Sequence, residues 1–297
     1  MNLKDLYNKG KEAIKRTGYG SFEVDARVLL LHSVGISAEH FYAHATEYIP
    51  SKAQIDEYEN LIRKRVARTP VAYITGKREF MGIEFTVNRS VLIPRPATEI
   101  LVEKALEVLE AGGWLTPQVA DIGCGSGNIA LSLAYYNPYV HVTATDVSSD
   151  SLDVARLNLD RISKRCPEKK IGARIELVPG SLYEPFRGKF EGSFSMIVSN
   201  PPYVTQEEWE ALMDGVRIFE PKGALCPPGE PEEFYRKIVA DAILYLQDDG
   251  FLVLEIGSGQ GDVVKGIFEK LGYKDIFLIR DLEGFDRVVG GRYEHLG

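Results

Sequence analysis

The run Ser199-Asn200-Pro201-Pro202-Tyr203 contains residue types suited to holding a planar nitrogen group. Asn200 offers a side-chain carbonyl oxygen as a hydrogen-bond acceptor. The two prolines fix the backbone and remove two N–H donors, so the main-chain oxygen of Pro201 is free to accept from a ligand. Tyr203 offers a flat face for stacking. The run predicts a binding loop for an amide or amino nitrogen, with Asn200, Pro201, Pro202 and Tyr203 as substrate-binding residues.

An amide or aryl NH2 is a poor nucleophile because its lone pair is delocalised. The Asn200 side-chain oxygen and the Pro201 main-chain oxygen could each accept one of its N–H groups. The nitrogen would then be held with its lone pair aimed at an electrophilic methyl group, and its developing positive charge would be stabilised. No strong general base is needed before such a transfer, and none is visible. We therefore predict Asn200, Pro201 and Tyr203 as catalytic residues.

A glycine-rich run, Asp-Ile-Gly-Cys-Gly-Ser-Gly at residues 121–127, follows an apolar segment. Glycines at alternate positions let the backbone turn tightly and let a ligand approach its N–H groups. The dinucleotide fingerprint requires a third small residue where Asn128 stands, which disfavours a nicotinamide cofactor. Asp146 lies 19 positions after Gly127, where an acid can accept hydrogen bonds from ribose hydroxyls. Asp121 and Asp146 together favour a cationic cofactor over an anionic one.

These runs need a framework that brings them together, and the pattern after Pro94 predicts one. Helical and apolar segments alternate there, which is typical of a parallel sheet covered on both faces. Ligands of such sheets bind at the carboxyl ends of the strands. The expected strands cover residues 119–122, 140–146, 174–178, 195–199, 251–256, 276–279 and 287–290, and the expected helices cover residues 97–110, 128–136, 151–162, 231–246 and 263–271.

The part of the chain before Pro94 has a different pattern. Residues 5–68 show helical periodicity and predict a small helical bundle. Residues 80–93 read as an extended stretch with Ile83, Phe85 and Val87 on one side, and Asn88-Arg89-Ser90 as the turn of a hairpin. We expect three segments: an N-terminal helical domain over 1–75, an extended or hairpin connector over 76–94, and a catalytic domain over 95–297.

Composition and charge restrict the function classes. The formal net charge is −8, which argues against a general nucleic-acid binder, although residues 1–80 carry a net +3. Cys124, Cys166 and Cys226 have no spacing typical of zinc sites or disulfides, and His40 and His44 lack a third ligand, so no metal is expected. No apolar signal region or membrane-spanning run is present. We expect a cytoplasmic protein without a membrane partner.

The glycine run resembles motif I of the class I S-adenosyl-L-methionine (AdoMet) methyltransferases. The whole chain resembles the HemK/PrmC family of peptide chain release factor glutamine N5-methyltransferases. The residues that carry this resemblance are 73–76, 79–82, 93–99, 121–127, Asp146, 200–203 and 286–289.

The resemblance implies a Rossmann-like α/β fold with a seven-stranded, mostly parallel sheet, a small helical substrate-recognition domain and a β-hairpin connector. It implies that AdoMet is the cofactor and that a methyl group is transferred to the glutamine amide nitrogen of the Gly-Gly-Gln motif in class I release factors. The implied cofactor-binding residues are Asp121, Gly123, Cys124, Gly125, Ser126, Gly127, Asp146, Ser181, Leu182 and Asn200.

The sequence departs from the family pattern at three places. Ala97 stands where an acid is usual, Ser181-Leu182 where Asp and an aromatic are usual, and residues 226–230 replace a glycine-rich acidic stretch. Two other functions remain open. One is a nucleic-acid amino-methyltransferase of the adenine N6 type, which uses the same Asn-Pro-Pro-Tyr run on a flipped base. The other is a non-catalytic AdoMet-binding module that docks on release factors.

Three further sequence features have simple structural interpretations. Arg95 and Glu99 either line the pocket or hold the connector against the sheet, and for Glu99 we favour the structural role. The glycine cluster at residues 257–261 is interpreted as a turn between a strand and a helix.

Overall fold

The structure is a computed structural model that describes residues 1–295. The chain forms two compact units. The first unit contains residues 1–77 together with residues 213–219. The second contains residues 78–212 and the described chain from Glu220 onward.

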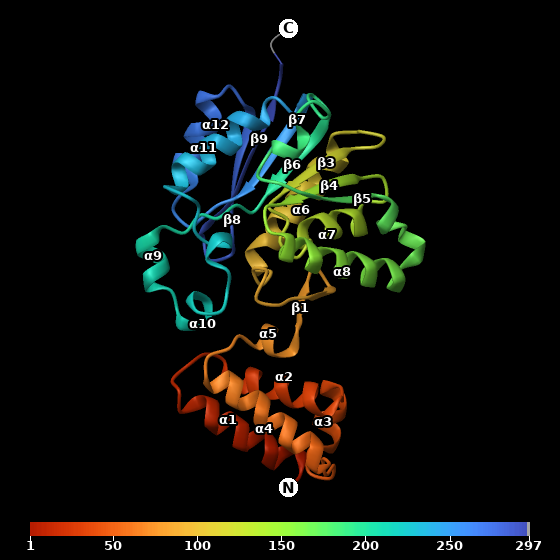
Figure 1. Cartoon of the computed structure of the whole chain (residues 1–297), viewed down its shortest axis with the longest axis vertical. Coiled ribbons are helices and arrows are strands. Elements are labelled where there is room, and N and C mark those ends of the chain that lie inside the picture. Colours follow the sequence, from red (N-terminus) through yellow and green to blue (C-terminus); the bar gives the residue numbers. More distant parts are fainter. Residues whose placement is uncertain (296–297) are drawn as a thin grey trace. The chain divides into compact units, whose positions relative to one another are not determined.

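The first unit is helical (Figure 1). Capping boxes begin two of its helices, through Asn2 with Asp5 and through Ser51 with Gln54. Gly35 adopts a left-handed conformation that ends another helix. The core is formed by the buried side chains of Leu3, Leu6, Ile14, Leu29, Leu30, Tyr58 and Leu61. The helices are α1 (Leu3–Lys15), α2 (Phe22–Val34), α3 (Ala38–His44), α4 (Lys52–Val66), α5 (Val71–Thr75) and α10 (Asp214–Arg217).

The second unit is built on a seven-stranded sheet with the order β5-β4-β3-β6-β7-β9-β8 (Figure 1). Strand pairs from β5 through β7 are parallel, and β9 runs antiparallel to both of its neighbours. The strands are β3 (Gln118–Ile122), β4 (His141–Asp146), β5 (Ile175–Pro179), β6 (Phe194–Ser199), β7 (Leu246–Glu255), β8 (Lys274–Arg280) and β9 (Asp286–Tyr293). The predicted seven-stranded, mostly parallel α/β fold is confirmed.

Two hydrophobic clusters cover the two faces of this sheet. One joins the strands to α6 (Pro96–Ala111), α7 (Asn128–Tyr136) and α8 (Ser149–Arg165). The other joins them to α11 (Pro231–Ala242) and α12 (Gly261–Lys270). A further short helix, α9 (Gln206–Ala211), follows the Ser-Asn-Pro-Pro-Tyr segment at residues 199–203, which is called the reaction run from here on. Because both faces are covered by helices, the place where a ligand can reach this sheet is the end of the sheet at which its strands terminate.

The predicted hairpin is present, but its turn was predicted at the wrong place. The strands are β1 (Lys77–Phe80) and β2 (Ile83–Thr86), so the turn is Met81-Gly82. Both residues have positive φ, +51° and +66°, as a two-residue hairpin turn of type I′ requires. Asn88 instead makes a local turn in which its side chain accepts from the Ser90 N–H. The alternation of Ile83, Phe85 and Val87 is confirmed, since all three are buried.

One helix was predicted too long. Helix α11 ends at Ala242, and Leu246 instead opens β7, where it pairs with Phe194 of β6. The apolar residues of 242–246 continue the helical stripe in sequence, so periodicity alone could not separate the two elements.

Candidate active site

Strand register brings the runs predicted from sequence to one edge of the sheet. The end of β3, Ile122, is level with Thr145 of β4 and Ser199 of β6. Ser199 is in turn level with Leu254 of β7. The ends of these strands and the segments that follow them therefore lie side by side. Asp146 and Glu255 are the last residues of β4 and β7, and the glycine run and Asn200 lie in the segments after β3 and β6.

The glycine run forms a tight turn between β3 and α7. Gly123, Gly125 and Gly127 have φ values of +75°, +55° and +78°, which side chains with a Cβ rarely adopt. The N–H groups of Gly123 and Cys124 donate to the Thr145 main-chain oxygen at 2.8 and 2.9 Å. At Gly127 a Cβ would also lie 3.1 Å from Leu131. The three glycines are thus required by the backbone path itself.

Asp146 is linked directly to this turn. Its Oδ2 accepts from the Gly125 N–H at 2.8 Å, and its Oδ1 accepts from the Ser148 N–H at 2.9 Å. Burial raises the pKa of the Asp146 carboxyl, while these N–H donors act in the opposite direction. The carboxyl is therefore fixed at the end of β4, beside the glycine turn.

Asp121 is fully buried beneath the same turn. Its Oδ2 accepts from the Ala130 N–H at 3.1 Å, and its Oδ1 has no hydrogen-bond partner among residues 1–295. Burial raises the pKa of this carboxyl to about 7, the Ala130 N–H lowers it, and the nearby Asp146 raises it further. Its Oδ1 is thus an unsatisfied buried acceptor beneath the glycine turn.

A cavity of about 400 Å³ opens along this edge, within the second unit. Its volume is in the range of small-molecule sites. Its lining brings together nearly all of the predicted site residues: Gly123, Cys124, Gly125, Ser126, Asp146, Ser181, Leu182, Asn200, Pro201 and Pro202. Asp121, Gly127 and Tyr203 are not part of the lining. The lining also includes residues of the stretch after the hairpin, namely Ser90, Val91, Leu92, Pro94, Arg95 and Thr98.

The Asn200 side chain lies at the cavity with a defined orientation. Its Nδ2 donates to the Thr98 hydroxyl oxygen at 3.2 Å. Within the part of the chain that the structure describes, no hydrogen bond engages its Oδ1. The arrangement leaves the acceptor atom of Asn200 available to a ligand.

Tyr203 is turned away from the cavity toward the end of β7. Its hydroxyl donates to Glu255 Oε1 at 3.1 Å, and its main-chain oxygen accepts from Gln260 at 3.1 Å. Burial raises the pKa of the Tyr203 hydroxyl, and the Glu255 carboxyl raises it further. Tyr203 therefore anchors the reaction run to the end of β7.

Arg95 and Glu99, whose roles the sequence left open, have separate positions. Arg95 lines the cavity, and its guanidinium binds the buried Glu220 carboxyl at 2.5 Å. Glu220 also accepts from the Ile93 N–H at 3.1 Å. Glu99 accepts from the Met81 N–H at 2.7 Å and so holds the hairpin turn, as predicted.

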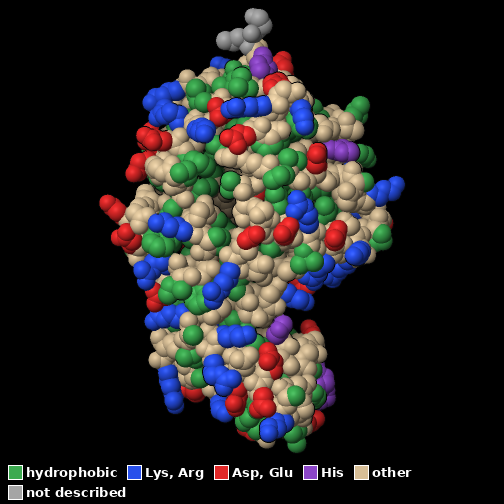
Figure 2. Space-filling view, in the orientation of Figure 1, with side chains coloured by type: hydrophobic (Ala, Val, Ile, Leu, Met, Phe, Trp, Pro, Cys, Tyr) green, Lys and Arg blue, Asp and Glu red, His purple; other side chains and the backbone are tan. Residues whose placement is uncertain are grey.

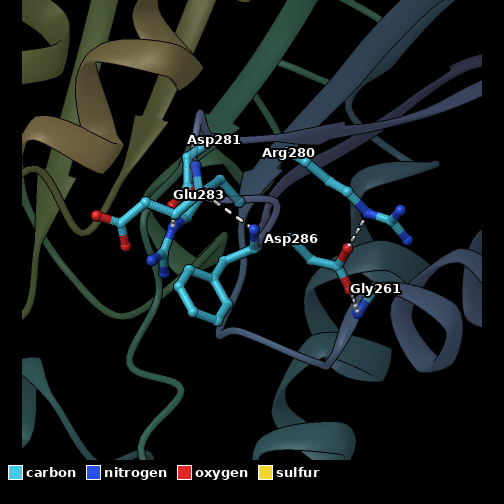
Figure 3. Close-up of polar contacts among 7 residues, drawn as sticks. Gly261, Arg280, Asp281, Glu283 and Asp286 are labelled. Carbon is cyan, nitrogen blue, oxygen red and sulfur yellow. Dashed lines mark hydrogen bonds and ion pairs between the residues drawn. The ribbon is translucent and has the colours of Figure 1, made fainter.

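The residues 257–261 form the predicted turn between β7 and α12, and the β8–β9 loop supports it (Figure 3). Asp286 accepts from the Gly261 N–H at 3.2 Å and binds Arg280 at 2.8 Å. In the same loop Asp281 accepts from two main-chain N–H groups and pairs with Arg287 at 2.7 Å. Asp286 and Arg287, two of the residues that carry the family resemblance, therefore have a structural role in this loop.

Sequence reasoning missed three residues at the site, namely Thr98, Glu220 and Glu255. Glu255 had a usable signal, because it is a single acid in the apolar run Phe251-Leu-Val-Leu-Glu-Ile256, at the carboxyl end of a predicted strand. Thr98 lies in the segment 93–99 that carries the family resemblance, but nothing local in the sequence shows that its side chain reaches Asn200. Glu220 had no local signal, since it reaches Arg95 through the fold.

On the face shown in Figure 2, basic and acidic side chains are interspersed. No group of three or more potential metal ligands occurs among residues 1–295. Within that range no helix has the length and apolar character needed to cross a membrane.

Comparisons with known proteins agree with this architecture. A family model described as PrmC N-terminal domain matches residues 5–76, and one described as methyltransferase small domain matches residues 95–246. The release factor glutamine methyltransferase of Geobacter sulfurreducens is 37% identical over 275 residues, 93% of this chain and 91% of that protein. The protein of the same name from Clostridium botulinum is 34% identical over 292 residues, 98% of this chain and 99% of that protein.

A solved structure with lower sequence identity than these relatives also supports the fold. The catalytic domain of hMettl16 in complex with MAT2A 3'UTR hairpin 6 has a TM-score of 0.55 and 16% identity, over 80% of this chain and 84% of that chain. At that identity the likeness shows the fold alone.

The relatives above 30% identity match both units together with the edge that holds the glycine turn and Asn200, and on this ground the chain belongs to the release factor glutamine methyltransferase family.

Proposed function

We propose that this protein transfers a methyl group from AdoMet to the side-chain amide nitrogen of the glutamine in the Gly-Gly-Gln motif of class I peptide chain release factors. The observation that carries the proposal is the Asn200 side chain, whose Nδ2 is held by Thr98 and whose Oδ1 is left for a ligand. It stands on the same sheet edge as the glycine turn, one residue after β6.

The residues around the glycine turn fit a cationic cofactor. Asp121 has an unpartnered buried oxygen, and Asp146 adds a second carboxyl at the same edge. When bound, AdoMet supplies a methyl group on a positively charged sulfur. The residues 121–127 would hold its methionine end, Asp146 its ribose, and Ser181 with Leu182 its adenine.

The acceptor nitrogen is held by two oxygens. The Asn200 Oδ1 and the Pro201 main-chain oxygen each accept one N–H of the glutamine amide. This orients the nitrogen and stabilises the positive charge that develops on it during transfer. No side chain has to remove a proton before the transfer. The methylated nitrogen still carries both N–H groups and a positive charge, and it would release one of these protons to water afterwards. Pro202 completes the wall beside the amide, and Tyr203 secures the run.

The two units have different roles in this proposal. The N-terminal helical domain, residues 1–75, recognises the release factor, residues 76–94 connect, and residues 95–297 carry out the transfer. The substrate takes part in translation, so the protein acts in the cytoplasm and without a membrane or nucleic-acid partner.

The test is a methylation assay with the full chain, AdoMet and a class I release factor, read by mass spectrometry of the Gly-Gly-Gln peptide. A mass gain of one methyl group on the glutamine, absent when that glutamine is replaced by alanine, is the expected result. Label in DNA or RNA instead would favour the adenine N6-type reaction. AdoMet binding without transfer to any substrate would favour a non-catalytic docking module.

A further inference from the structure

The Pro201 main-chain oxygen is one of the two acceptors in the proposed reaction, and its direction depends on the backbone of the reaction run. The prolines at 201 and 202 fix φ at both positions. Because Pro201 itself precedes a proline, its ψ is restricted to extended values as well. The segment from Asn200 to Tyr203 is therefore stiff, and the position of the Pro201 oxygen is set by how the two ends of this segment are held.

The first end is held by the sheet. Ser199, the last residue of β6, is level with Ile122 of β3, and its hydroxyl donates to the Ile122 main-chain oxygen at 2.7 Å. Asn200 follows directly, with its Nδ2 bonded to Thr98. The chain has left the sheet by Tyr203, so another element has to hold the backbone at that end.

Gln260, the residue before α12, makes this contact. Its Nε2 donates to the Tyr203 main-chain oxygen at 3.1 Å. Its Oε1 accepts from the Gly257 N–H at 2.9 Å and from the Tyr235 hydroxyl at 3.0 Å. A main-chain N–H can only donate, and a main-chain oxygen can only accept. The Gln260 amide therefore satisfies both main-chain groups in one orientation only, with its NH2 toward Tyr203.

Close packing keeps the Gln260 side chain in this place. A Cβ at Gly257 would lie 2.7 Å from the Gln260 Oε1, so the side chain can come this close because residue 257 is a glycine. Tyr235, on α11, is buried with an exposed fraction of 2%, and its hydroxyl oxygen also accepts from the Gly257 N–H at 3.3 Å. The cluster at residues 257–261 thus connects β7 to α12 and also carries a side chain to the reaction run.

We propose that Gln260 is a positioning residue, which fixes the far end of the reaction run and so keeps the Pro201 main-chain oxygen at the acceptor nitrogen. Tyr203 is then held twice, through its hydroxyl by Glu255 and through its main-chain oxygen by Gln260. The first bond fixes the ring, whereas the second fixes the backbone that continues from Pro201. This inference rests on the role of the Pro201 oxygen in the proposed methyl transfer.

The test compares two substitutions of Gln260 in the full chain, by single-turnover methylation of a release factor at saturating AdoMet. Gln260→Met keeps the length of the side chain and removes its donor and its acceptor. Gln260→Glu keeps an acceptor for Gly257 and Tyr235 but places a second oxygen against the Tyr203 oxygen. We expect the rate to fall by about 3–30-fold in Gln260→Met and by at least as much in Gln260→Glu, since small displacements of a reacting group have effects of this size.

The comparison separates positioning of the reaction run from a structural role in the turn. If Gln260 only stabilised residues 257–261, its acceptor oxygen would be sufficient, and Gln260→Glu would keep the full rate. A full rate in either variant, or a loss that disappears at higher AdoMet concentration, overturns the proposal. The matched controls are Gln118→Met and Gln118→Glu, which should keep the full rate. Gln118 is an exposed glutamine at the start of β3 that also donates to a main-chain oxygen, that of Thr116 at 3.2 Å.

A third variant disturbs the same contact without changing Gln260, and it covers the case in which the Gln260 variants do not fold. Gly257→Ala places a Cβ against the Gln260 amide and should displace it, with a loss of about 3–30-fold. In a Gln260→Ala background the same substitution should cause no further loss, because it acts through Gln260. A full rate in Gly257→Ala, or the same loss in both backgrounds, overturns the proposal.

The unmodified protein distinguishes failure of this inference from failure of the proposed function. If the unmodified protein transfers no methyl group to the glutamine, the proposed function is wrong and the inference falls with it. If it does transfer the methyl group, and the variants of Gln260 and Gly257 match its rate, the inference alone is wrong.

Discussion

At the scale of single residues, two buried carboxyls stand out near the carboxyl ends of β3 and β7. Asp121 and Glu255 are both at most 1% exposed. Burial raises the pKa of each to about 7. Keeping an ionised carboxyl out of water opposes folding, so each is maintained at a cost in stability. That cost is consistent with a supporting role behind the site, where Asp121 holds the Ala130 N–H beneath the glycine turn and Glu255 holds the Tyr203 hydroxyl.

Glu255 makes the stability of the protein depend on pH in a defined direction. Its pKa is about 7 in the folded chain, against an ordinary value of 4.5. Between these values the folded state holds a proton that the unfolded state has lost, so stability falls as pH rises. Glu255→Gln removes this contribution. We expect the loss of unfolding free energy between pH 5 and pH 8, measured by urea denaturation, to be smaller in the variant by about 2 kcal/mol.

A non-titrating substitution provides the control for this experiment. Ser132 is buried in α7, and its hydroxyl has no hydrogen-bond partner within residues 1–295. Ser132→Ala should shift the whole curve of stability against pH up or down without changing its slope. An unchanged slope in Glu255→Gln would show that the carboxyl is not protonated in the folded chain near neutral pH.

Asp146 gives a prediction about the cofactor alone. Asp146→Asn removes the charge and one acceptor oxygen at the end of β4, so we expect AdoMet to bind about 10–100-fold more weakly. Isothermal calorimetry measures this directly. Asp153→Asn is the matched control, because Asp153 is an exposed acid that pairs with Arg156 in the helix after this loop. Equal affinity in Asp146→Asn and the unmodified protein would remove Asp146 from the proposed site.

At the scale of elements, the hairpin is held to the sheet from three helices. Glu99 of α6 binds the Met81 N–H, and the Tyr136 hydroxyl of α7 donates to the Met81 oxygen at 2.6 Å. From α8, Asn158 bonds both the N–H and the oxygen of Thr86, at 2.7 and 3.0 Å. Asn158 also donates to the Ser126 main-chain oxygen at 2.9 Å. One buried amide therefore joins the hairpin to the glycine turn.

Removing that amide should loosen both segments. Asn158→Ala leaves buried main-chain groups of Thr86 and Ser126 without partners, so we expect the free energy of unfolding to fall by about 2–4 kcal/mol. Urea denaturation measures the fall, and weaker AdoMet binding should accompany it. Asn88→Ala serves as the control, because Asn88 is exposed and its side chain accepts from the nearby Ser90 N–H. A fall no larger than that of the control would contradict the joining role.

The elements also show where sequence reasoning succeeds and where it fails. The glycine turn, Asp146 and Asn200 were found because each directly follows an apolar run, and register in a parallel sheet brings strand ends together. The hairpin turn was misplaced because Asn88-Arg89-Ser90 has typical turn residues, whereas Met81 is not a typical residue for positive φ. Its main chain is bonded there by Glu99 and Tyr136, which are distant in sequence. Contacts between distant segments left no local pattern to detect.

At the scale of the whole molecule, the first unit includes a segment from the middle of the chain. Residues 213–219 belong to it, although they lie between the reaction run and α11. Asp214 binds Arg68 at 3.0 Å. Gly215 is so close to Tyr19 that a Cβ would lie 2.2 Å from its hydroxyl oxygen. Glu220, which follows residue 219 directly, binds Arg95 at the cavity.

This path gives the proposed recognition unit a short covalent route to the cavity wall, and a single methyl group can test it. Gly215→Ala forces Tyr19 or the segment to shift, so we expect KM for a full-length release factor to rise about 3–10-fold, in line with the effect of small displacements on binding geometry. AdoMet affinity should stay the same, because the glycine turn and Asp146 are far along the chain and in the other unit. Gly266→Ala in α12 is the matched control, since a Cβ there meets no atom within 4 Å.

If both variants methylate the release factor with the KM of the unmodified protein, residues 213–219 do not transmit the position of the first unit to the site. If Gly215→Ala instead lowers AdoMet affinity, the segment acts on the cofactor side, and the separate roles proposed for the two units are wrong.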